Sequence, residues 1–441
     1  MNVVFQSQRE MRARREAALR KGVVAVIDIG SSKIACLVLQ FTPDGPEPAP
    51  GTHLRQSPFR VIGAATTRSR GVSYGEVTEM EETERAIRTA VQAAQKMAQQ
   101  RVDYALVTLS GGAPRSYGLT GDTRVANGEV SEADVGEALA ACDVPDFGVE
   151  REAIHALPVN FALDHRSGLR DPRGQVGAKL AVDMHLLTVD AGVVHNVLHC
   201  VRRCDLEPAG LVTAPYAAGL SALVEDEQEL GAACIDLGGE TTGLSVFVKR
   251  HMIYTDCVDI GGAHVTRDIC QGLVIPHAAA ERIKSLHGGV MATGLDDRDM
   301  IEVPPLAGEE EGDRRQISRA DLIGVIRPRM EEILEDVRLR LEACGFDDLA
   351  SQRIVLTGGG SQMPGLETLA KRMLGRQVRI GRPMRVQGLP QSATGGAFAA
   401  AVGLALHASH PQDECWDFDM PSDRIGSRRM RRTLRWFREN W

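Results

Sequence analysis

Two stretches of the chain share one pattern, and this repetition limits the possible folds more than any other feature. Residues 23–39 form an apolar, β-branched run that contains Asp28, then a turn of small residues and a second apolar run; residues 232–247 repeat this order around Asp236. Each stretch predicts a strand, a tight turn and a second strand. A plain hairpin has no reason to repeat an acid and a glycine together. The repetition therefore predicts two similar halves that face one another and clasp one anion between their turns.

The residue types of the first turn suit a bound phosphate. Gly30, Ser31 and Ser32 allow the backbone N–H groups to approach an anion, and Lys33 follows them. Asp28 beside them is suited to a hydrated Mg²⁺, which keeps several waters and binds only one or two carboxylates. The alternative is an ordinary hairpin in which Asp and Ser only satisfy turn geometry.

A third glycine-rich element spans residues 353–366 and predicts a strand, a turn and a helix. Gly358, Gly359 and Gly360 leave the turn without side chains, so a flat ring or a ribose can lie against the backbone. A dinucleotide-binding G-x-G-x-x-G motif is excluded because Met363 occupies the last glycine position and no βαβ unit with an acid follows. No P-loop motif is present either. Residues 392–405, rich in small side chains, predict a closely packed helix.

The length and composition indicate a soluble protein of several domains. A chain of 441 residues is too long for one simple core. Residues 111–182 read as short strands around one helix that starts at Ser131, which predicts a module inserted into the first half. Nine scattered cysteines without a C-x-x-C pair predict reduced thiols. No segment approaches the roughly 18 uninterrupted apolar residues of a membrane-spanning helix.

Charge is distributed unevenly along the chain. Residues 1–21 carry six basic and two acidic side chains, and residues 428–441 carry six arginines and one glutamate, although the whole chain has a net charge of −8. The acidic body would repel nucleic acid, so no nucleic-acid partner is expected. Residues 1–21 show no periodic apolar face and are predicted to be a basic disordered tail. Residues 408–427 are predicted to be a flexible linker.

Residues 428–441 predict an amphipathic helix. At about 100° per residue, four apolar side chains fall within about 60° of one another and the arginines occupy the opposite arc. A helix that lies in an anionic membrane surface needs both features, whereas docking into the groove of a partner protein is the alternative. All three tryptophans lie in the last 26 residues, which predicts that none belongs to the folded body. The residues predicted to contact lipid are Arg428, Arg429, Met430, Arg431, Arg432, Leu434, Arg435, Trp436, Phe437, Arg438 and Trp441.

The two D-x-G turns and the later strand-GGG-helix resemble the actin-like ATPase superfamily. The inserted module and the segments at 71–77, 229–239 and 354–359 are similar to the FtsA family of cell-division proteins, and the resemblance covers roughly residues 22–410. It implies an α/β, actin-like (ribonuclease H-like) duplicated two-domain ATPase fold with an inserted FtsA-type subdomain and a C-terminal amphipathic helix. The chain departs from many relatives at Glu240, and an acid near the phosphates predicts weaker hydrolysis or a changed metal site.

The resemblance also implies domain limits and a nucleotide site. The first half comprises 22–110 with 183–215 and part of 380–407; the second comprises 216–379, with a smaller subdomain at about 262–320. The implied nucleotide-binding residues are Asp28, Gly30, Ser31, Ser32 and Lys33 in the first turn, Asp236, Gly238, Gly239 and Thr241 in the second, Glu281 and Lys284 beside the nucleoside, and Gly358, Gly359 and Gly360 beside the adenosine. Asp28 and Asp236 would hold Mg²⁺ through water. An exposed helix ion pair is the alternative for Glu281 and Lys284.

The function implied by the resemblance is that of an adaptor. ATP with Mg²⁺ would bind between the halves and favour a homopolymer. The assembled chains would anchor FtsZ filaments to an anionic lipid membrane, peripherally on the cytoplasmic face of the inner membrane at the division site, and recruit other division proteins. No water-activating residue stands out, so at most slow ATP hydrolysis is expected. The alternatives are an actin-fold small-molecule kinase and a pilus-assembly-type ATPase.

Overall fold

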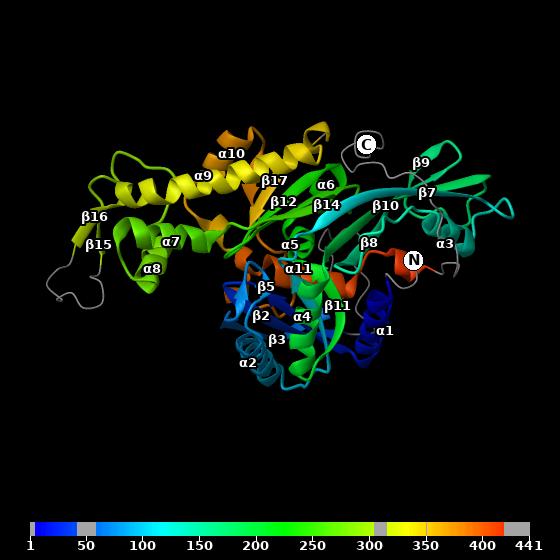
Figure 1. Cartoon of the computed structure of the whole chain (residues 1–441), viewed down its shortest axis with the longest axis horizontal. Helices are drawn as coiled ribbons and strands as arrows, with labels where there is room; N and C mark the ends of the chain where they lie inside the picture. The colour runs from blue at the N-terminus through cyan, green and yellow to red at the C-terminus, as the bar shows by residue number, and fades with distance from the viewer. Residues whose placement is uncertain (1–4, 42–58, 304–314, 350, 419–441) are drawn as a thin grey trace.

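The repeated pattern forms the centre of two five-stranded sheets. The computed structural model describes residues 5–41, 59–303, 315–349 and 351–418. β1 (Val23–Ile29) pairs antiparallel with β2 (Lys33–Phe41), and β12 (Ala232–Leu237) pairs in the same way with β13 (Thr242–Val248). The sheet orders are β11-β6-β1-β2-β3 and β14-β13-β12-β17-β18. The prediction of two similar halves is confirmed (Figure 1).

The remaining strands give both sheets the same mixed character. β1 and β12 each run parallel to the strand on their other side, which is β6 or β17. The bounds are Phe59–Arg68 for β3, Tyr104–Leu109 for β6, Glu207–Thr213 for β11, His251–Val258 for β14, Arg353–Thr357 for β17 and Val378–Ile380 for β18. Parallel pairing brings the ends of β1 and β6, and of β12 and β17, to the same edge of each sheet, where the glycine turns lie.

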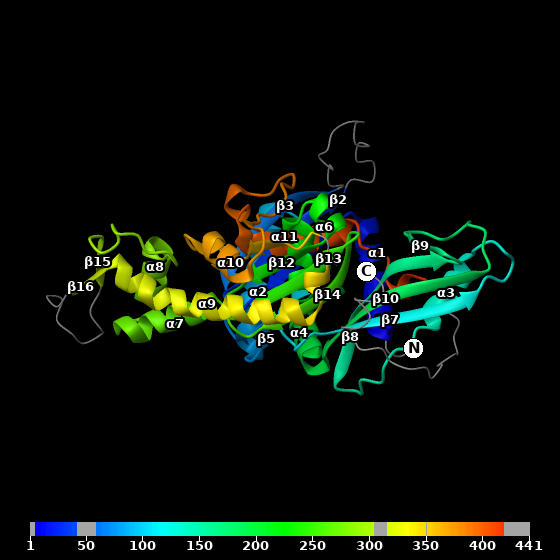
Figure 2. The same cartoon turned by 90° about the horizontal axis from the view of Figure 1, so that it is seen from above.

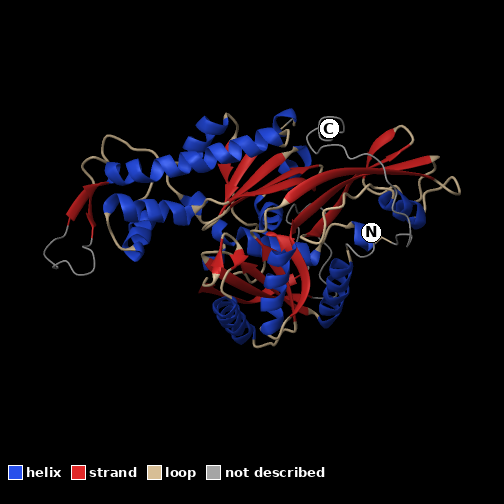
Figure 3. Ribbon diagram, in the orientation of Figure 1, coloured by secondary structure: helices blue, strands red, loops and turns tan. Residues whose placement is uncertain are grey.

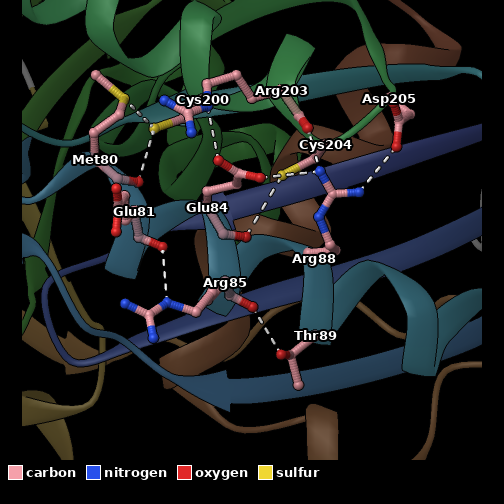
Figure 4. A network of polar contacts seen from close by, with 10 residues as sticks. All are labelled: Met80, Glu81, Glu84, Arg85, Arg88, Thr89, Cys200, Arg203, Cys204 and Asp205. Atoms are coloured by element: carbon pink, nitrogen blue, oxygen red, sulfur yellow. Dashed lines mark hydrogen bonds and ion pairs between the residues drawn. The ribbon is translucent and has the colours of Figure 1, made fainter.

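Two helices pack on each other and on the sheet of the first half. α2 (Met80–Ala98) and α4 (Ala191–Arg203) meet through thiol and ion-pair contacts (Figure 4). Cys200 Sγ lies 2.9 Å from Met80 Sδ, and Arg88 Nη1 lies 2.9 Å from Asp205 Oδ2.

All nine cysteines are free, in agreement with the expectation of reduced thiols. No helix among the described residues is long and apolar enough to cross a membrane.

Two small-residue helices lie between the sheets (Figure 3). α11 (Ala399–Ser409) contacts β1, and α5 (Ala214–Ala222) contacts β12. A Cβ atom at Gly403 would collide with the Ala217 carbonyl, so the close packing predicted for the small-residue segment is confirmed. The predicted start at residue 392 was wrong, because the 3₁₀ turns η3 (Gln391–Ala393) and η4 (Gly396–Phe398) precede the helix.

The inserted module is a separate four-stranded antiparallel sheet with its own core. Its strands β7 (Arg115–Arg124), β8 (Arg151–Leu163), β9 (Arg166–Leu169) and β10 (Lys179–Asp190) are ordered β7-β10-β8-β9, and α3 (Glu132–Ala140) packs on them. α3 begins at the predicted Ser131 cap, whose hydroxyl accepts a hydrogen bond from the Asp134 amide. The module projects from the body on the side away from β15 and β16 (Figure 2).

The smaller subdomain of the second half is mostly helical. It contains α7 (Gly262–Leu273), α8 (His277–His287), the hairpin of β15 (Met300–Val303) and β16 (Arg315–Ser318), and the first part of α9 (Arg319–Ala343). α9 begins at the predicted capping box of Ser318 and Asp321 and contains Pro328. α10 (Leu366–Leu374) lies beside α9 where the long helix returns to the second sheet (Figure 1).

The prediction of a disordered tail at residues 1–21 was wrong, because Gln6–Lys21 forms helix α1. Met11 and Ala18 are buried and α1 packs against β11. The apolar face is narrow and lies among arginines, so the basic composition concealed it. Acids of the body and of the C-terminal segment compensate the charge: Arg12 lies 2.9 Å from Asp417, and Lys21 lies 2.9 Å from Asp103.

The predicted linker at 408–427 was wrong as far as Phe418. η5 (Cys415–Asp417) packs into the core of the inserted module, where the Trp416 ring centroid lies 5.4 Å from that of Phe5. The claim that no tryptophan belongs to the folded body was also wrong, since Trp416 is only 6% exposed. Glu414 fixes this segment by accepting hydrogen bonds from the amide of Ala156 (2.8 Å) and from His155 (3.0 Å). Residues 419–427 and the predicted helix at 428–441 lie outside the described residues.

We predict that Trp416→Ala lowers the free energy of unfolding by about 3 kcal/mol, because it leaves a cavity between α1 and the inserted module. Urea denaturation of the full chain, followed by far-UV circular dichroism, measures this loss. Trp436→Ala, which changes the tryptophan that the sequence assigns to lipid, is the matched control and should leave the unfolding curve unchanged. Equal effects of the two substitutions would contradict the packing described for Trp416.

Candidate functional site

The first glycine turn fixes a buried carboxylate at the end of β1. Asp28 is 7% exposed, and its Oδ1 accepts a hydrogen bond from Thr108 Oγ1 on β6 at 2.8 Å. The Thr108 hydroxyl in turn accepts a hydrogen bond from the Ile29 amide at 3.0 Å. The Gly30 amide closes the turn on the Lys33 carbonyl at 3.1 Å. Burial raises the pKa of Asp28, so this carboxyl group carries its charge at an energetic cost.

Lys33 places a cation between the two acids of the repeated pattern. Burial lowers its pKa, and the charges of Asp28 and Asp236 oppose this shift. Its Nζ donates a hydrogen bond to the Ala397 carbonyl and lies 3.5 Å from the centroid of the Phe398 ring. Both partners are neutral and belong to η4. A phosphate would be a stronger partner for this ammonium group than a carbonyl oxygen, because both groups would then be charged.

The second turn is held by the first residues of α7. The Gly238 amide donates to the Thr241 carbonyl at 3.0 Å. The amides of Gly262 and Ala263 donate to the carbonyls of Gly238 and Gly239, at 3.0 and 2.7 Å. Thr241 is 8% exposed. The turn therefore has a fixed shape, and the smaller subdomain is attached to it directly.

The Asp236 side chain is the corresponding acid of the second half and is partly exposed. It accepts no hydrogen bond from any residue that the structure describes. Burial, together with the nearby charge of Asp28, raises its pKa to about 7. A second carboxylate without a donor beside the first is the kind of environment that a hydrated cation would stabilise.

The two turns touch across the boundary between the halves. A Cβ atom at Gly239 would lie 3.0 Å from the Cβ of Ser32, so only a glycine allows this approach without a shift. Ser31 Oγ accepts a hydrogen bond from the Gly75 amide at 3.0 Å. The turns thus face one another, as the repetition in the sequence predicts.

The third glycine element completes a ring of segments around Lys33. A Cβ atom at Gly358, which has φ = 84°, would collide with the Asp236 carboxylate. A Cβ at Gly360 would lie 3.1 Å from that of Leu237, and one at Gly359 would lie 3.8 Å from that of Ala397 in η4. The ring therefore passes from the first turn through η4 and the third element to the second turn and back to Ser32.

Glu281 and Lys284 lie next to this ring. Lys284 Nζ donates hydrogen bonds to Glu281 Oε2 (2.7 Å), to Thr266 Oγ1 (2.7 Å) and to the Gly262 carbonyl (3.0 Å). The two residues thus form the helix ion pair of the alternative interpretation, in which the Lys284 side chain is 14% exposed and that of Glu281 is 49% exposed. At the end of α8, the Val290 amide donates to the Pro364 carbonyl at 3.0 Å, which joins this helix to the third element.

The departure at Glu240 has a structural role that the sequence did not reveal. Its Oε2 accepts hydrogen bonds from Ser73 Oγ at 2.9 Å and from the Tyr74 amide at 2.8 Å, and its Oε1 lies 3.2 Å from Arg267. Both oxygens are thus engaged, the first by the opposite half and the second by α7. The expected effect of Glu240 on the metal therefore has no support in its contacts.

Sequence reasoning also missed Thr108, Thr266 and Phe398. The only signal for Thr108 is a hydroxyl near the end of an apolar strand, and Thr266 and Phe398 carry no pattern of their own. Their partners, Asp28, Lys284 and Lys33, lie far away in the sequence. Together, the two acids, the partly buried ammonium group and the three glycine-containing turns fit a nucleotide with a hydrated divalent cation.

Comparison with known proteins assigns the family. The family model "Cell division protein FtsA" matches residues 233–403, and the model "SHS2 domain inserted in FTSA" matches residues 111–188. The cell division protein FtsA of Agrobacterium fabrum is 42% identical over 389 residues, which are 88% of this chain and 87% of the relative. That of Rhizobium meliloti is 39% identical over 425 residues, 96% of each chain.

Solved structures share the fold at much lower identity. The PilM-PilN type IV pilus biogenesis complex aligns with a TM-score of 0.60 at 19% identity, over 88% of this chain and 99% of that one. MreB5 of Spiroplasma citri bound to ADP aligns with a TM-score of 0.52 at 13% identity, over 87% and 95%. These two establish the actin-like fold alone, and the relatives above establish the family. The chain therefore belongs to the cell division protein FtsA family, as a bacterial division protein with an actin-like fold and an inserted SHS2 domain.

Proposed function

We propose that this chain binds ATP with Mg²⁺ between its two halves, self-assembles, and anchors FtsZ filaments to the cytoplasmic face of the inner membrane at the division site. The observation that carries the proposal is the ring of three glycine elements around Asp28, Lys33 and Asp236. The ring lies in a chain whose relatives are cell division proteins. MreB5, which shares the fold, was solved bound to ADP.

Each part of the ring has a task in nucleotide binding. Apart from the Gly30 and Gly238 amides, which close the turns, the amides of the two turns bind phosphate oxygens together with the Lys33 ammonium group, while Gly358, Gly359 and Gly360 leave room for the adenosine. Glu281 and Lys284 contact the nucleoside from α8. Asp28 and Asp236 hold Mg²⁺ through its waters, and the cation would neutralise phosphate charge and offset the repulsion between the two acids.

Nucleotide binding favours the arrangement in which the turns touch. A ligand that binds one conformation more tightly shifts the population toward it by its difference in affinity. The arrangement in which the turns touch presents one fixed surface to neighbouring copies of the chain. Because nucleotide binding favours this arrangement, it promotes formation of a polymer. Binding alone is sufficient for this effect, and hydrolysis is slow at most. The smaller subdomain contacts FtsZ, and the inserted module serves polymer contacts or other division proteins.

The C-terminal residues 428–441 supply the anchor. Basic residues near an anionic membrane contribute about 1 kcal/mol each, so one helix binds weakly and reversibly. A polymer presents many such helices together, which raises the total affinity without new contacts. Phe418, the last described residue, is 9% exposed and packs in the core of the inserted module, so the described chain ends at a fixed position on the body.

We predict that Asp236→Asn weakens Mg²⁺-dependent ATP binding at least tenfold but stabilises the nucleotide-free protein above pH 7. The pKa of this carboxyl group is about 7 in the folded protein, against 3.8 for an ordinary aspartate side chain. Between these values the folded state holds a proton that the unfolded state has lost, so wild-type stability falls as the pH rises. Relative to wild type, the variant therefore gains no stability below pH 3.8 and reaches its full gain in stability above pH 7.

Calorimetric titration with Mg²⁺-ATP and melting temperatures from pH 5 to 8.5 measure both effects. Asp268→Asn, which alters an acid paired with Arg329 at 2.7 Å within the second half, controls for general loss of charge. An Asp236 variant with wild-type affinity, or one that is destabilised equally at all pH values, would remove Asp236 from the proposed site.

We predict that the full chain sediments with phosphatidylglycerol vesicles, more strongly with Mg²⁺-ATP, and that a chain ending at Ser427 does not. Phe437→Asp should release the protein, because it places a charge in the apolar stripe. Asn440→Asp adds the same charge outside the stripe and should retain most binding. Equal sedimentation of the full and shortened chains would contradict the anchor.

A further inference from the structure

A short hairpin of the first half reaches toward the second turn. It consists of β4 (Val72–Ser73) and β5 (Glu76–Val77). Its base is fixed by the Gly71 carbonyl, which accepts hydrogen bonds from the amides of Thr78 (2.8 Å) and Glu79 (3.0 Å) and from Thr83 Oγ1 (2.8 Å). The Thr78 hydroxyl is a fourth donor at 3.2 Å, so four donors on one carbonyl bind the hairpin firmly to the start of α2.

The tip of the hairpin is fixed as well. Gly75 has φ = 75° and packs so closely on Gly111 that a side chain at Gly75 would collide with the backbone. The Gly75 amide donates to Ser31 of the first turn at 3.0 Å, and Glu76 Oε1 accepts from the Gly112 amide at 3.2 Å. The hairpin is therefore a rigid extension of the first half and contacts the first phosphate turn directly.

Tyr74 adopts a backbone conformation that few non-glycine residues adopt. Its φ is 51°, in the left-handed region, where a bulky side chain carries strain. In this conformation its amide donates to Glu240 of the second half at 2.8 Å, and its ring centroid lies 5.8 Å from that of His264 on α7. Tyr74 and Gly75 are the two loop residues of this hairpin, and a two-residue type I′ loop requires positive φ at both, so the turn sets the conformation that aims the Tyr74 amide at the opposite half.

Glu240 receives this tip with a charged acceptor. Ser73 Oγ and the Tyr74 amide both donate to its Oε2, and Arg267 lies 3.2 Å from its Oε1. The Glu240 side chain is only 20% exposed, so these hydrogen bonds are partly shielded from water. Hydrogen bonds to a charged group are stronger than those between neutral groups. The contact adjoins Gly239, which touches Ser32 of the first turn.

We propose that Glu240 is a positioning residue that latches the second phosphate turn to the 72–77 hairpin of the first half and thereby slows the release of bound nucleotide. The inference rests on the proposed nucleotide site and names a regulator of it. We call Ser73, Tyr74 and Glu240 the latch. The two glycine turns cannot separate until the Glu240 carboxylate loses the hydrogen bonds from Ser73 and Tyr74, so separation of the halves breaks the latch.

Glu240→Ala tests the latch in the full chain, with Asp268→Asn as the matched control. Asp268 pairs with Arg329 at 2.7 Å, has a side-chain exposure of 24%, and makes its contact inside one half. A fluorescent ATP analogue is bound with Mg²⁺ and chased with excess ATP in a stopped-flow instrument. Release from Glu240→Ala should be about tenfold faster than from wild type, because hydrogen bonds to a charged acceptor are lost. Release from Asp268→Asn should match wild type.

A second measurement needs no nucleotide. Hydrogen–deuterium exchange of residues 71–77 in the free protein should be faster in Glu240→Ala than in wild type and unchanged in Asp268→Asn. Wild-type protein that binds no analogue would overturn the proposed nucleotide site, while faster exchange in the variant would still support a contact between the halves. Unchanged exchange together with unchanged release would overturn the latch. Faster exchange with unchanged release would overturn its role in nucleotide retention.

Discussion

Two acids and one ammonium group lie where the two glycine turns meet, and the rest of the structure depends on this cluster. Burial raises the pKa of Asp28 and Asp236 and lowers that of Lys33, which means that burial destabilises the charged form of each group. The surrounding backbone can approach so closely only because Gly239 and Gly358 carry no side chains. The protein without ligand therefore retains like charges close together, which a cation and an anionic nucleotide would relieve.

The cluster is connected to both ends of the chain by packed elements. Lys33 contacts Ala397 and Phe398, α11 follows directly, and α11 leads into the segment held by Glu414 and Trp416. That segment lies against α1 and the inserted module. The first half, the SHS2 domain and both ends of the described chain thus share one junction. The position at which the described chain ends is consequently set by the same body that carries the glycine turns.

Features that depend on near neighbours in sequence could be predicted, and features that depend on distant partners could not. The D-x-G turns, the glycine element at 358–360 and the caps at Ser131 and Ser318 are local patterns, and all were located from the sequence. α1 was misjudged because its narrow apolar face packs on β11, which lies far away in the sequence, and Trp416 because its aromatic partner Phe5 lies at the other end of the chain. Glu240 was recognised as unusual, but its partners Ser73 and Tyr74 could not be predicted, because they reach Glu240 only when the two halves face one another.

The most direct test of the account is whether Mg²⁺-ATP protects all the segments of the ring at once. Hydrogen–deuterium exchange of the full chain should slow together at residues 28–33, 236–241, 281–284 and 358–360 when Mg²⁺-ATP is added, and much less with ATP and a chelator. Protection confined to one half, or no protection in a folded protein at saturating nucleotide, would contradict a nucleotide held between the two turns.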